Sequence, residues 1–326
     1  MRILSIAICF TLFAASSSIR AEEKVKIDEK TKAAIDKALD WLKENQNKDG
    51  SWGNNTAITS FSLLAFMSNG HLPDKGKYGP EVAKGVRNLL AASRDDGYLV
   101  GSTGGNMYAH GMATLALSQV WGMSGDPDVK KVLKKAVDLI VKCQNHEGGW
   151  RYEPQPTGAD ISVTIMQVMA LRGAKDSGLH VPKETITKAI GYINKCYDKK
   201  SGGYRYQPQS YGPGYARTAA GVCVLQLAGE YDKKEIEGAI RYMESTGEDR
   251  QHYWYGHYYA AHAFHQIGDK KWEEYYERMS KKLLSTQQKD GNWRDSKEGH
   301  VGPAYQTAIA ILILSVPAHY LPIYQR

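Results

Sequence analysis

Two histidines stand where the rest of the sequence repeats a threonine, and a histidine at such a position could transfer protons. Alignment of the apolar segments on one another places six polar residues at one equivalent position: Thr59, His110, Thr164, Thr218, His257 and Thr307. A threonine near the start of a helix commonly bonds local backbone, so the threonines fit a packing rule. Imidazole exchanges protons near neutral pH, so His110 and His257 are a candidate catalytic pair. The alternative is that both histidines are structural.

Other candidate residues lie in the segments that lead into these six positions. Asp160 precedes the third apolar segment, in GADISVT, and Arg217 opens the fourth, in YARTAAGV. A carboxylate and a cation of this kind could serve as acid or base and as charge neutraliser. The same segments contribute candidate rim residues for ligand binding: Tyr215, Tyr255, Tyr305, Trp254, Arg205 and Arg151, with Tyr152, Tyr204, Tyr206, Tyr211 and Tyr253 near them. Tyrosine and tryptophan stack on sugar rings and on amphipathic ligands alike, so the ligand class stays open.

A repeated sequence pattern must position these residues. The segments 37–52, 135–150 and 278–293 read KALDWLKENQNKDGSW, KAVDLIVKCQNHEGGW and RMSKKLLSTQQKDGNW. In each, a cation stands nine residues before a Gln, and a turn with Gly and Trp follows. Weaker copies end at Gly97-Tyr98 and Gly203-Tyr204, and a degenerate copy has Trp254. Spacings of roughly 40 to 55 residues are typical of arrays of two-helix units.

Two kinds of helix are predicted by the apolar periodicity and by the Pro and Gly residues that bound the segments. Helices with one apolar face are predicted at 31–46, 80–93, from 127, from 182, 234–245 and 271–287. Segments that are apolar nearly all round are 56–68, 107–120, 159–173, 215–229, 255–266 and 304–314. A helix of the second kind needs cover on every side, which an outer ring of the first kind supplies. The sequence therefore predicts an all-α fold, a single (α/α)6 toroid over residues 22–326, with the six polar positions near one mouth.

The turns QNKDGSW, QNHEGGW and QQKDGNW resemble the QW repeats of the terpene cyclase and protein prenyltransferase superfamily. The resemblance covers the mature chain and is closest to small, exported, single-toroid prenyltransferase and squalene oxidase repeat proteins. It implies the toroid fold, but the catalytic sets of the superfamily are not matched. No DxDD acid motif is present, and Asp160 has no second Asp beside it. The zinc-binding Asp-x-Cys pair is broken because Gly221 stands two residues before Cys223, so we expect neither a metal nor a cofactor.

The N-terminal residues 1–21 are predicted to be a signal peptide, with Arg2, an apolar run and a small-residue cleavage zone. We therefore expect an exported protein, periplasmic or extracellular, without stable membrane insertion after cleavage. Removal of this segment lowers the formal net charge from +7 to +5. The charges are scattered along the chain, which argues against a nucleic-acid partner. Cys143 and Cys196 occupy equivalent positions in consecutive repeats, so a bridge between them is the alternative to three buried thiols with Cys223.

Three functions remain open on this sequence. The first is a binding protein that holds an isoprenoid, amphipathic or acidic-sugar ligand in a central cavity. The second is an enzyme, either a divergent terpene cyclase or isomerase, or a lyase acting on acidic polysaccharide with a histidine base and Arg217. The third is a protein-interaction scaffold. The unmatched catalytic motifs favour binding, and we expect His110 and His257 to face one shared cavity with Asp160 and Arg217 near its entrance.

Overall fold

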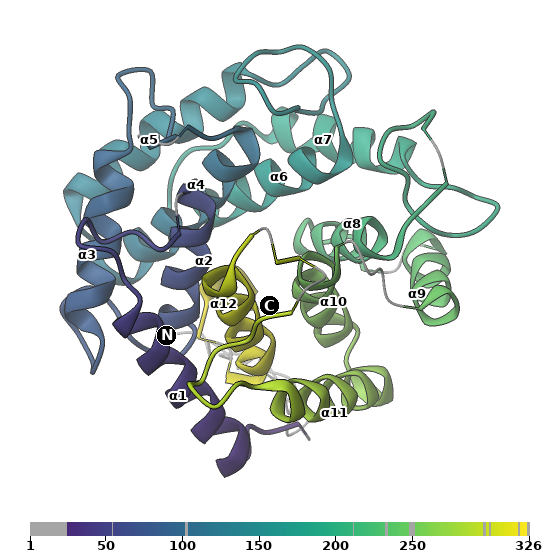
Figure 1. The fold of residues 1–326 in the computed structure, drawn as a ribbon. Helices are drawn as coiled ribbons and strands as arrows, with labels where there is room; N and C mark the ends of the chain where they lie inside the picture. Colours follow the sequence, from purple (N-terminus) through teal and green to yellow (C-terminus); the bar gives the residue numbers. More distant parts are fainter. Residues whose placement is uncertain are drawn as a thin grey trace, which may run out of the picture.

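Two concentric rings of helices make up the part of the chain that the structure describes (Figure 1). The computed structural model describes residues 25–53, 55–101, 104–210, 212–231, 234–247, 252–295, 298–299, 301–318 and 320–324, so the predicted signal peptide and Tyr211 lie outside it. The inner helices are α2 (Thr56–Met67), α4 (Met107–Ser124), α6 (Ile161–Asp176), α8 (Tyr215–Leu227), α10 (Tyr253–Ile267) and α12 (Pro303–Leu314). The outer helices are α1 (Glu29–Glu44), α3 (Gly79–Ala91), α5 (Pro127–Lys142), α7 (Lys183–Lys195), α9 (Lys234–Thr246) and α11 (Asp269–Thr286).

The inner ring is closed. Each inner helix packs against the next one in chain order, and α12 packs back against α2. Every residue of α2 is buried, and so is every residue of α12 after Tyr305, which explains why these segments carry no polar face. The outer helices each pack on inner helices and expose their Lys- and Glu-rich sides. The prediction of an all-α toroid is therefore confirmed.

Hydrogen bonds of the repeated Gln and Trp explain the repeat pattern. In unit three, the Gln144 amide donates to the carbonyl of its own turn residue Gly148 (2.8 Å) and to the carbonyl of Thr185 in the next outer helix (2.9 Å). The Trp150 indole N–H donates back to Ile140 O on its own outer helix (2.7 Å). Gln46 and Trp52 repeat these contacts in unit one, and Gln287 and Trp293 repeat them in unit six. Each Gln thus ties one unit to the next.

The turn glycines allow the closest approach between units. Gly148 has a φ of +98°, and a Cβ placed there would lie 2.3 Å from the carbonyl oxygen of Lys188. Only a residue without a side chain fits that space and that backbone conformation. Gly291 meets Lys37 in the same way, and the Gln287 amide donates to Ala34 O at 2.8 Å. Unit six therefore joins unit one by the contacts that join consecutive units.

The C-terminal residues 316–318 and 320–324 close one end of the inner ring. The Tyr324 ring stacks on His262 with centroids 3.5 Å apart, and its hydroxyl lies 2.5 Å from that of Tyr258. The Ile323 amide donates to Gln119 Oε1 (3.1 Å), near the end of α4. We call the opposite end, where the inner helices begin, the mouth of the ring. In the ranges described, no helix combines the length and the apolar character needed to cross a membrane.

Helix boundaries follow the predicted segments closely, with the largest shift at α4. This helix runs on to Ser124, past the predicted end at Val120, and stops at Gly125 with a φ of +70°. Glycine accepts this left-handed conformation, so the helix ends at Gly125 and not at the predicted Val120. The described cysteines Cys143, Cys196 and Cys223 are buried free thiols, so the structure contains no bridge between the first two.

Candidate functional site

Tyrosines line the mouth of the inner ring. On their helices they stand two residues before the position at which the six-fold alignment places His110, His257 and four threonines. Tyr108, Tyr255 and Tyr305 stand on α4, α10 and α12, and Ser162 stands at the same register on α6. These four side chains are half-buried, whereas most residues of the inner helices are fully buried. Helices α4 and α10 are not neighbours in the ring, yet the rings of Tyr108 and Tyr255 lie 6.2 Å apart. The tyrosines therefore meet across the axis.

Further aromatic side chains fill the axis beneath the mouth. Tyr259 packs edge-on against Tyr255 at 4.9 Å, and its hydroxyl points at the Met166 sulfur, 3.9 Å away. Phe61 packs edge-on against Tyr305 at 5.5 Å. Edge-to-face aromatic pairs at these distances are favourable contacts of a packed core. Aromatic side chains therefore fill the axis beneath Tyr255 and Tyr305.

Asp160 is the buried carboxylate beside this surface. It is 0% exposed and caps α6, with its Oδ1 accepting from the Val163 amide at 3.0 Å. Its Oδ2 is buried and makes no well-aligned hydrogen bond with the described residues. Burial raises the pKa of Asp160, while the Val163 amide, the Tyr206 hydroxyl and the Arg151 charge act in the opposite direction. A carboxyl with a raised pKa is a candidate proton donor or a polar anchor for a ligand.

Two loops at the rim, residues 152–158 and 206–210, hold the mouth in place. The Tyr152 carbonyl accepts from the Met107 amide at the start of α4 (2.8 Å). The Tyr206 carbonyl accepts from the Ile161 amide at the start of α6 (2.9 Å). The hydroxyls of Tyr152 and Tyr206 are 3.0 Å apart, so the two loops are also tied to each other. Each loop therefore satisfies an inner-helix amide of the preceding unit, which is otherwise an orphan donor.

Two carboxylates flank the phenols of the mouth. Burial raises the pKa of Tyr108 and of Tyr255, so both phenols stay protonated and can donate hydrogen bonds. The charge of Asp160 adds to this rise for Tyr255, and the charge of Glu298 adds to it for Tyr108. Glu298 is itself buried and accepts from the Trp254 amide at 3.3 Å. The hydroxyl oxygens of Tyr108 and Tyr255 are buried and make no well-aligned hydrogen bond with described residues. Tyr259 lies near enough to the first, and Ser162 to the second, to affect their pKa values.

His110 does not face a central cavity, which corrects the sequence-based expectation. It is fully buried between the rings, where Nδ1 accepts from the Leu99 amide (3.1 Å) and Nε2 donates to Ala136 O on α5 (3.2 Å). Burial lowers the pKa of His110 to about 4, so the ring is neutral near neutral pH. In units one, three, four and six the equivalent threonine accepts the amide of the turn aromatic, as Thr164 does for Trp150 at 3.1 Å. His110 serves a similar backbone role for the Leu99 amide, one residue after the turn aromatic Tyr98.

His257 also points outward, toward the outer ring. Its Nδ1 lies 3.0 Å from the hydroxyl of Tyr275 on α11, and its ring packs against Tyr253 and Tyr215. The two histidines thus occupy equivalent positions on their helices. Both side chains point toward the outer helices, so they do not come together. Tyr215 is buried in this contact and does not lie on the rim.

The remaining predicted rim residues divide into those at the mouth and those engaged elsewhere. The structure places Tyr255 and Tyr305 at the mouth, while Trp254 is buried and therefore is not a rim residue. Arg205 pairs with Asp198 at 3.1 Å, and Arg217 donates to Gly212 O in its own loop at 3.2 Å. The Arg205 cation is therefore held by an ion pair, whereas Arg217 bonds to its own loop and its buried Nε makes no hydrogen bond with the described residues. Arg151 is exposed, and its charge acts on Asp160.

Tyr108, Ser162 and Glu298 were missed as site residues. The first two could have been found by moving the six-fold alignment back by two residues, because a shift of two positions turns a helix by more than half a circle. The equivalent residues Ala57 and Ala216 show why no pattern stood out, since alanine occupies the position in two units. Glu298 carries no sequence signal, because it lies in a loop outside the repeat.

Concentric helix rings closed by Gln and Trp contacts define an α/α toroid, a fold shared with terpene cyclases, a mannanase and a cellobiose epimerase. The chain belongs to the family of the prenyltransferase alpha-alpha toroid domain, which matches residues 2–242 and 241–325. No curated protein matches the chain in sequence. The family agrees with the resemblance of the QW-type turns. Within the described residues, no group of three His, Cys, Asp or Glu side chains could hold a metal ion.

Solved structures of similar shape span several activities. The type II terpene cyclase MstE from Scytonema is similar with a TM-score of 0.62 at 14% identity, covering 91% of this chain and 100% of the cyclase. Cellobiose 2-epimerase from Bacillus thermoamylovorans gives 0.67 at 14%, covering 87% and 98%. An inactive double aspartate variant of an alpha-1,6-mannanase from a Salegentibacter species, bound to alpha-1,6-mannotriose, gives 0.65 at 10%, covering 87% and 98%. At such identities the likeness shows the fold alone.

Proposed function

We propose that the mouth of the toroid binds a carbohydrate or a similar polyhydroxylated, amphipathic ligand. The observation that carries this proposal is the meeting of Tyr108 and Tyr255 across the axis, 6.2 Å apart. Their rings offer faces on which a sugar can stack, and their hydroxyls and the Asp160 carboxyl offer hydrogen-bonding groups beside those faces. Specific sugar recognition needs this combination of flat apolar contact and directed polar contact.

A long isoprenoid is a poorer fit to the same site. The tyrosines and the aromatic side chains beneath them occupy the axis that an extended hydrocarbon would need in order to enter the ring. The polar lining would also leave Asp160 and the phenols facing a ligand without donors or acceptors. An unpaired buried polar group is costly, so a hydrocarbon would lose affinity at this mouth.

A catalytic role on a glycosidic ligand is the second candidate, and the two flanking carboxylates favour it. Glycoside hydrolases in general use a pair of carboxyl groups, one with a raised pKa as the acid. Asp160 and Glu298 are both buried beside the tyrosines, and the pKa of Asp160 is raised by burial. In this proposal Asp160 donates the proton and Glu298 is the second carboxylate. His110 and His257 have no part in it.

Export from the cell belongs to the same proposal, because a carbohydrate-binding mouth suits a protein that meets polysaccharide outside the cytoplasm. The predicted signal peptide at residues 1–21 supports it. Cell fractionation with an antibody against the mature domain tests it. Recovery of the processed chain, shortened at the N-terminus, from the periplasm or the medium is the expected result.

Isothermal titration calorimetry with cellobiose, mannotriose and a geranylgeranyl lipid tests the binding proposal. We expect a sugar to bind and the Tyr255→Phe variant, which keeps the ring and loses the hydroxyl, to bind it about five- to tenfold more weakly. Tyr231→Phe is the matched control, because Tyr231 is 42% exposed and lies away from the mouth. Preferred binding of the lipid, or equal affinities for the wild type and Tyr255→Phe, would refute the proposal.

Asp160→Asn separates binding from catalysis. Asparagine is as good a helix N-cap as aspartate, so the start of α6 should be preserved while the proton donor is lost. We expect retained folding by circular dichroism and weaker sugar binding. If the wild type cleaves a sugar oligomer, as judged by mass spectrometry of the products, the variant should not. Cleavage by the variant at the wild-type rate would exclude Asp160 as the acid.

A further inference from the structure

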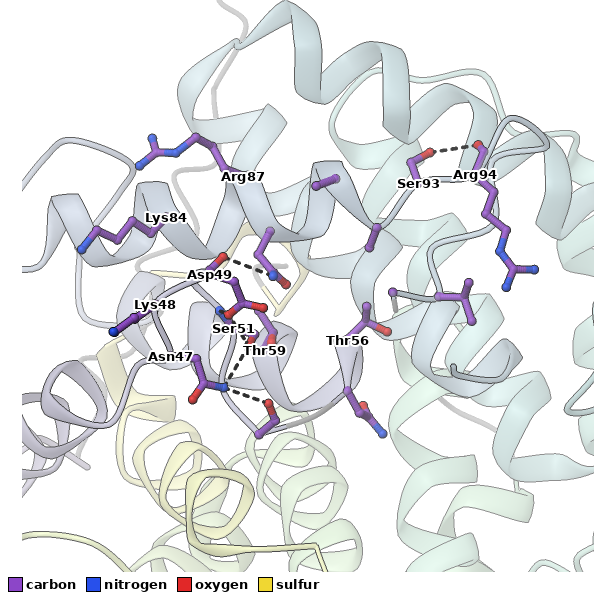
Figure 2. Close-up of a pocket in the computed structure, with 17 residues that line it drawn as sticks. Asn47, Lys48, Asp49, Ser51, Thr56, Thr59, Lys84, Arg87, Ser93 and Arg94 are labelled. Atoms are coloured by element: carbon purple, nitrogen blue, oxygen red, sulfur yellow. Dashed lines mark hydrogen bonds between the residues drawn. The ribbon is translucent and has the colours of Figure 1, made fainter. Parts of the chain in front are cut away.

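A separate cavity of about 1170 Å³ lies away from the axis, between the first and second units (Figure 2). We call it the basic groove. It is bounded by the first turn, the start of α2, one face of α3 and the segments after that helix: Asn47, Lys48, Asp49, Ser51, Gly53, Asn55, Thr56, Thr59, Lys84, Arg87, Asn88, Ala91, Ala92, Ser93, Arg94, Val100 and Gly101. None of the candidate mouth residues is among them.

The groove is open because the connection in unit one is short. Only residues 53–55 link Trp52 to the start of α2, whereas residues 151–160 and 205–214 make the same connection in units three and four. Those longer segments contain the rim loops that hold the mouth in place. Among the residues that the structure describes, no comparable loop follows Trp52 beside α3. The opening is therefore specified by the local sequence of unit one.

Cations dominate the wall of the basic groove. Lys48, Lys84, Arg87 and Arg94 line it and are exposed, against the single acid Asp49. The Asp49 carboxylate is engaged inside its own turn, accepting from the Ser51 amide (3.0 Å) and hydroxyl (2.7 Å). In the described part of the chain, none of the four cations forms an ion pair. Figure 2 shows Lys84 and Arg87 on one side of the groove and Arg94 on the other.

A buried hydroxyl on the groove wall is an independent sign of a ligand. Thr56 is 4% exposed, and its Oγ1 makes no hydrogen bond within the described residues. It is the first residue of α2, whose start carries partial positive charge from its free amides. Asn55 uses its side-chain oxygen to cap the Ala57 and Ile58 amides, so it does not satisfy Thr56. A buried polar atom without a partner calls for a ligand or a bound water.

We propose that the basic groove binds an acidic polysaccharide, a chain of sugars carrying carboxylate or sulfate groups. The helical rise places Lys84 and Arg94 roughly 15 Å apart along α3 and its end, which suits an extended polyanion better than one phosphate. The lining is rich in amides and hydroxyls, such as Asn55, Asn88 and Ser93, that match sugar hydroxyls. No aromatic side chain lines the groove, so it lacks the stacking platforms that single-stranded nucleic acids use.

This inference rests on the groove residues alone and does not depend on the mouth. The two sites lie toward the same end of the toroid, since both are built by the segments that lead into the inner helices. A neutral sugar at the mouth and an acidic chain in the groove are tested by different ligands and by different variants. Failure of one test therefore leaves the other result readable.

Fluorescence anisotropy with a labelled oligogalacturonate at low salt tests the groove. The double variant Lys84→Ala, Arg87→Ala should bind about tenfold or more weakly than the wild type, since each cation can make charge-assisted bonds. The control is Lys131→Ala, Lys134→Ala, which removes two exposed lysines of the same spacing from α5. We expect the control variant to bind the oligogalacturonate with the affinity of the wild type. Added salt should lower the affinity of the wild type and of the control. Equal affinities of the two double variants would overturn the proposal.

Thr56→Val provides a second, structure-neutral probe. Valine matches the shape of threonine and removes only the unpartnered hydroxyl, so the free energy of unfolding should stay equal or rise. Binding of the oligogalacturonate should weaken several-fold. Unchanged binding would mean that the hydroxyl does not meet the ligand, and it would overturn this part of the site. Tighter binding of a single-stranded DNA of equal charge, lost in the Lys84→Ala, Arg87→Ala variant, would replace the polysaccharide by a nucleic acid.

Discussion

The buried neutral state of His110 predicts a pH-dependent stability that a single substitution removes. Both ring nitrogens are engaged by backbone, and burial lowers the pKa from the ordinary 6.5 to about 4. The unfolded chain therefore takes up a proton at a higher pH than the folded chain. The contribution of the neutral His110 ring to the free energy of unfolding is therefore complete above about pH 6.5 and is lost as the pH falls toward 4. His110→Thr installs the residue that four other units use at this position.

The size of the effect follows from the pKa difference. Between about pH 7 and about pH 5, the His110 proton should cost the folded state about 2 kcal/mol of unfolding free energy. Urea unfolding followed by circular dichroism at both pH values measures this loss in the wild type and in His110→Thr. The variant should lose about 2 kcal/mol less than the wild type, whatever its stability at neutral pH. Other titrating groups act in both proteins and cancel in the comparison.

A parallel loss of stability in the two proteins would refute the reasoning. It would mean that His110 titrates at its ordinary pKa and that its contacts with Leu99 and Ala136 do not hold the neutral ring. The size of any pH-independent offset between the two proteins reports only the change in packing volume. The slope with pH, and not the offset, is therefore the quantity that tests the role of this histidine.

The joints between units give two further predictions. Gly148→Ala should lower the free energy of unfolding by more than about 2 kcal/mol, because its Cβ would lie 2.3 Å from the Lys188 carbonyl oxygen. The control is Gly178→Ala, at a φ of +90° with nothing within 4 Å, which should lower it by about 1–2 kcal/mol. Gln287→Ala should cost about 1–3 kcal/mol by leaving two carbonyls unpaired where the ring closes, whereas exposed Gln288→Ala should be near neutral. Urea unfolding measures the stability of all four variants. Equal losses of unfolding free energy in a variant and its control would contradict the proposed role of the contacts.

The helices, and their division into an inner and an outer ring, could be predicted from the sequence. Both depend on patterns within single segments of the chain. Periodicity separates one-faced from all-round apolar segments, and Gly and Pro mark the ends. The Gln and Trp turns identified the repeat, although the specific partners of Gln144, the carbonyls of Gly148 and Thr185, needed the structure. A Gln amide can reach many carbonyls, and only the packing of neighbouring units selects two of them.

The site was less predictable because it depends on the rotation of each inner helix. Alignment of the repeats identified equivalent positions correctly. At the position chosen, however, His110 and His257 face the outer helices. The residues that reach the axis stand two positions earlier, where Tyr108 and Tyr255 meet. Apolar periodicity cannot tell these two faces apart when an inner helix is buried on all sides, since both faces are apolar environments.

Local patterning was enough to specify the α-helices of the described residues, their two rings and the closing turns, because each follows from spacing along one segment. Tertiary packing decided which polar groups are buried without partners, how the axis is filled and where the short connection at residues 53–55 leaves the basic groove open. These properties depend on distances between residues far apart in the chain. Closure of the ring sets those distances, and no single segment encodes them.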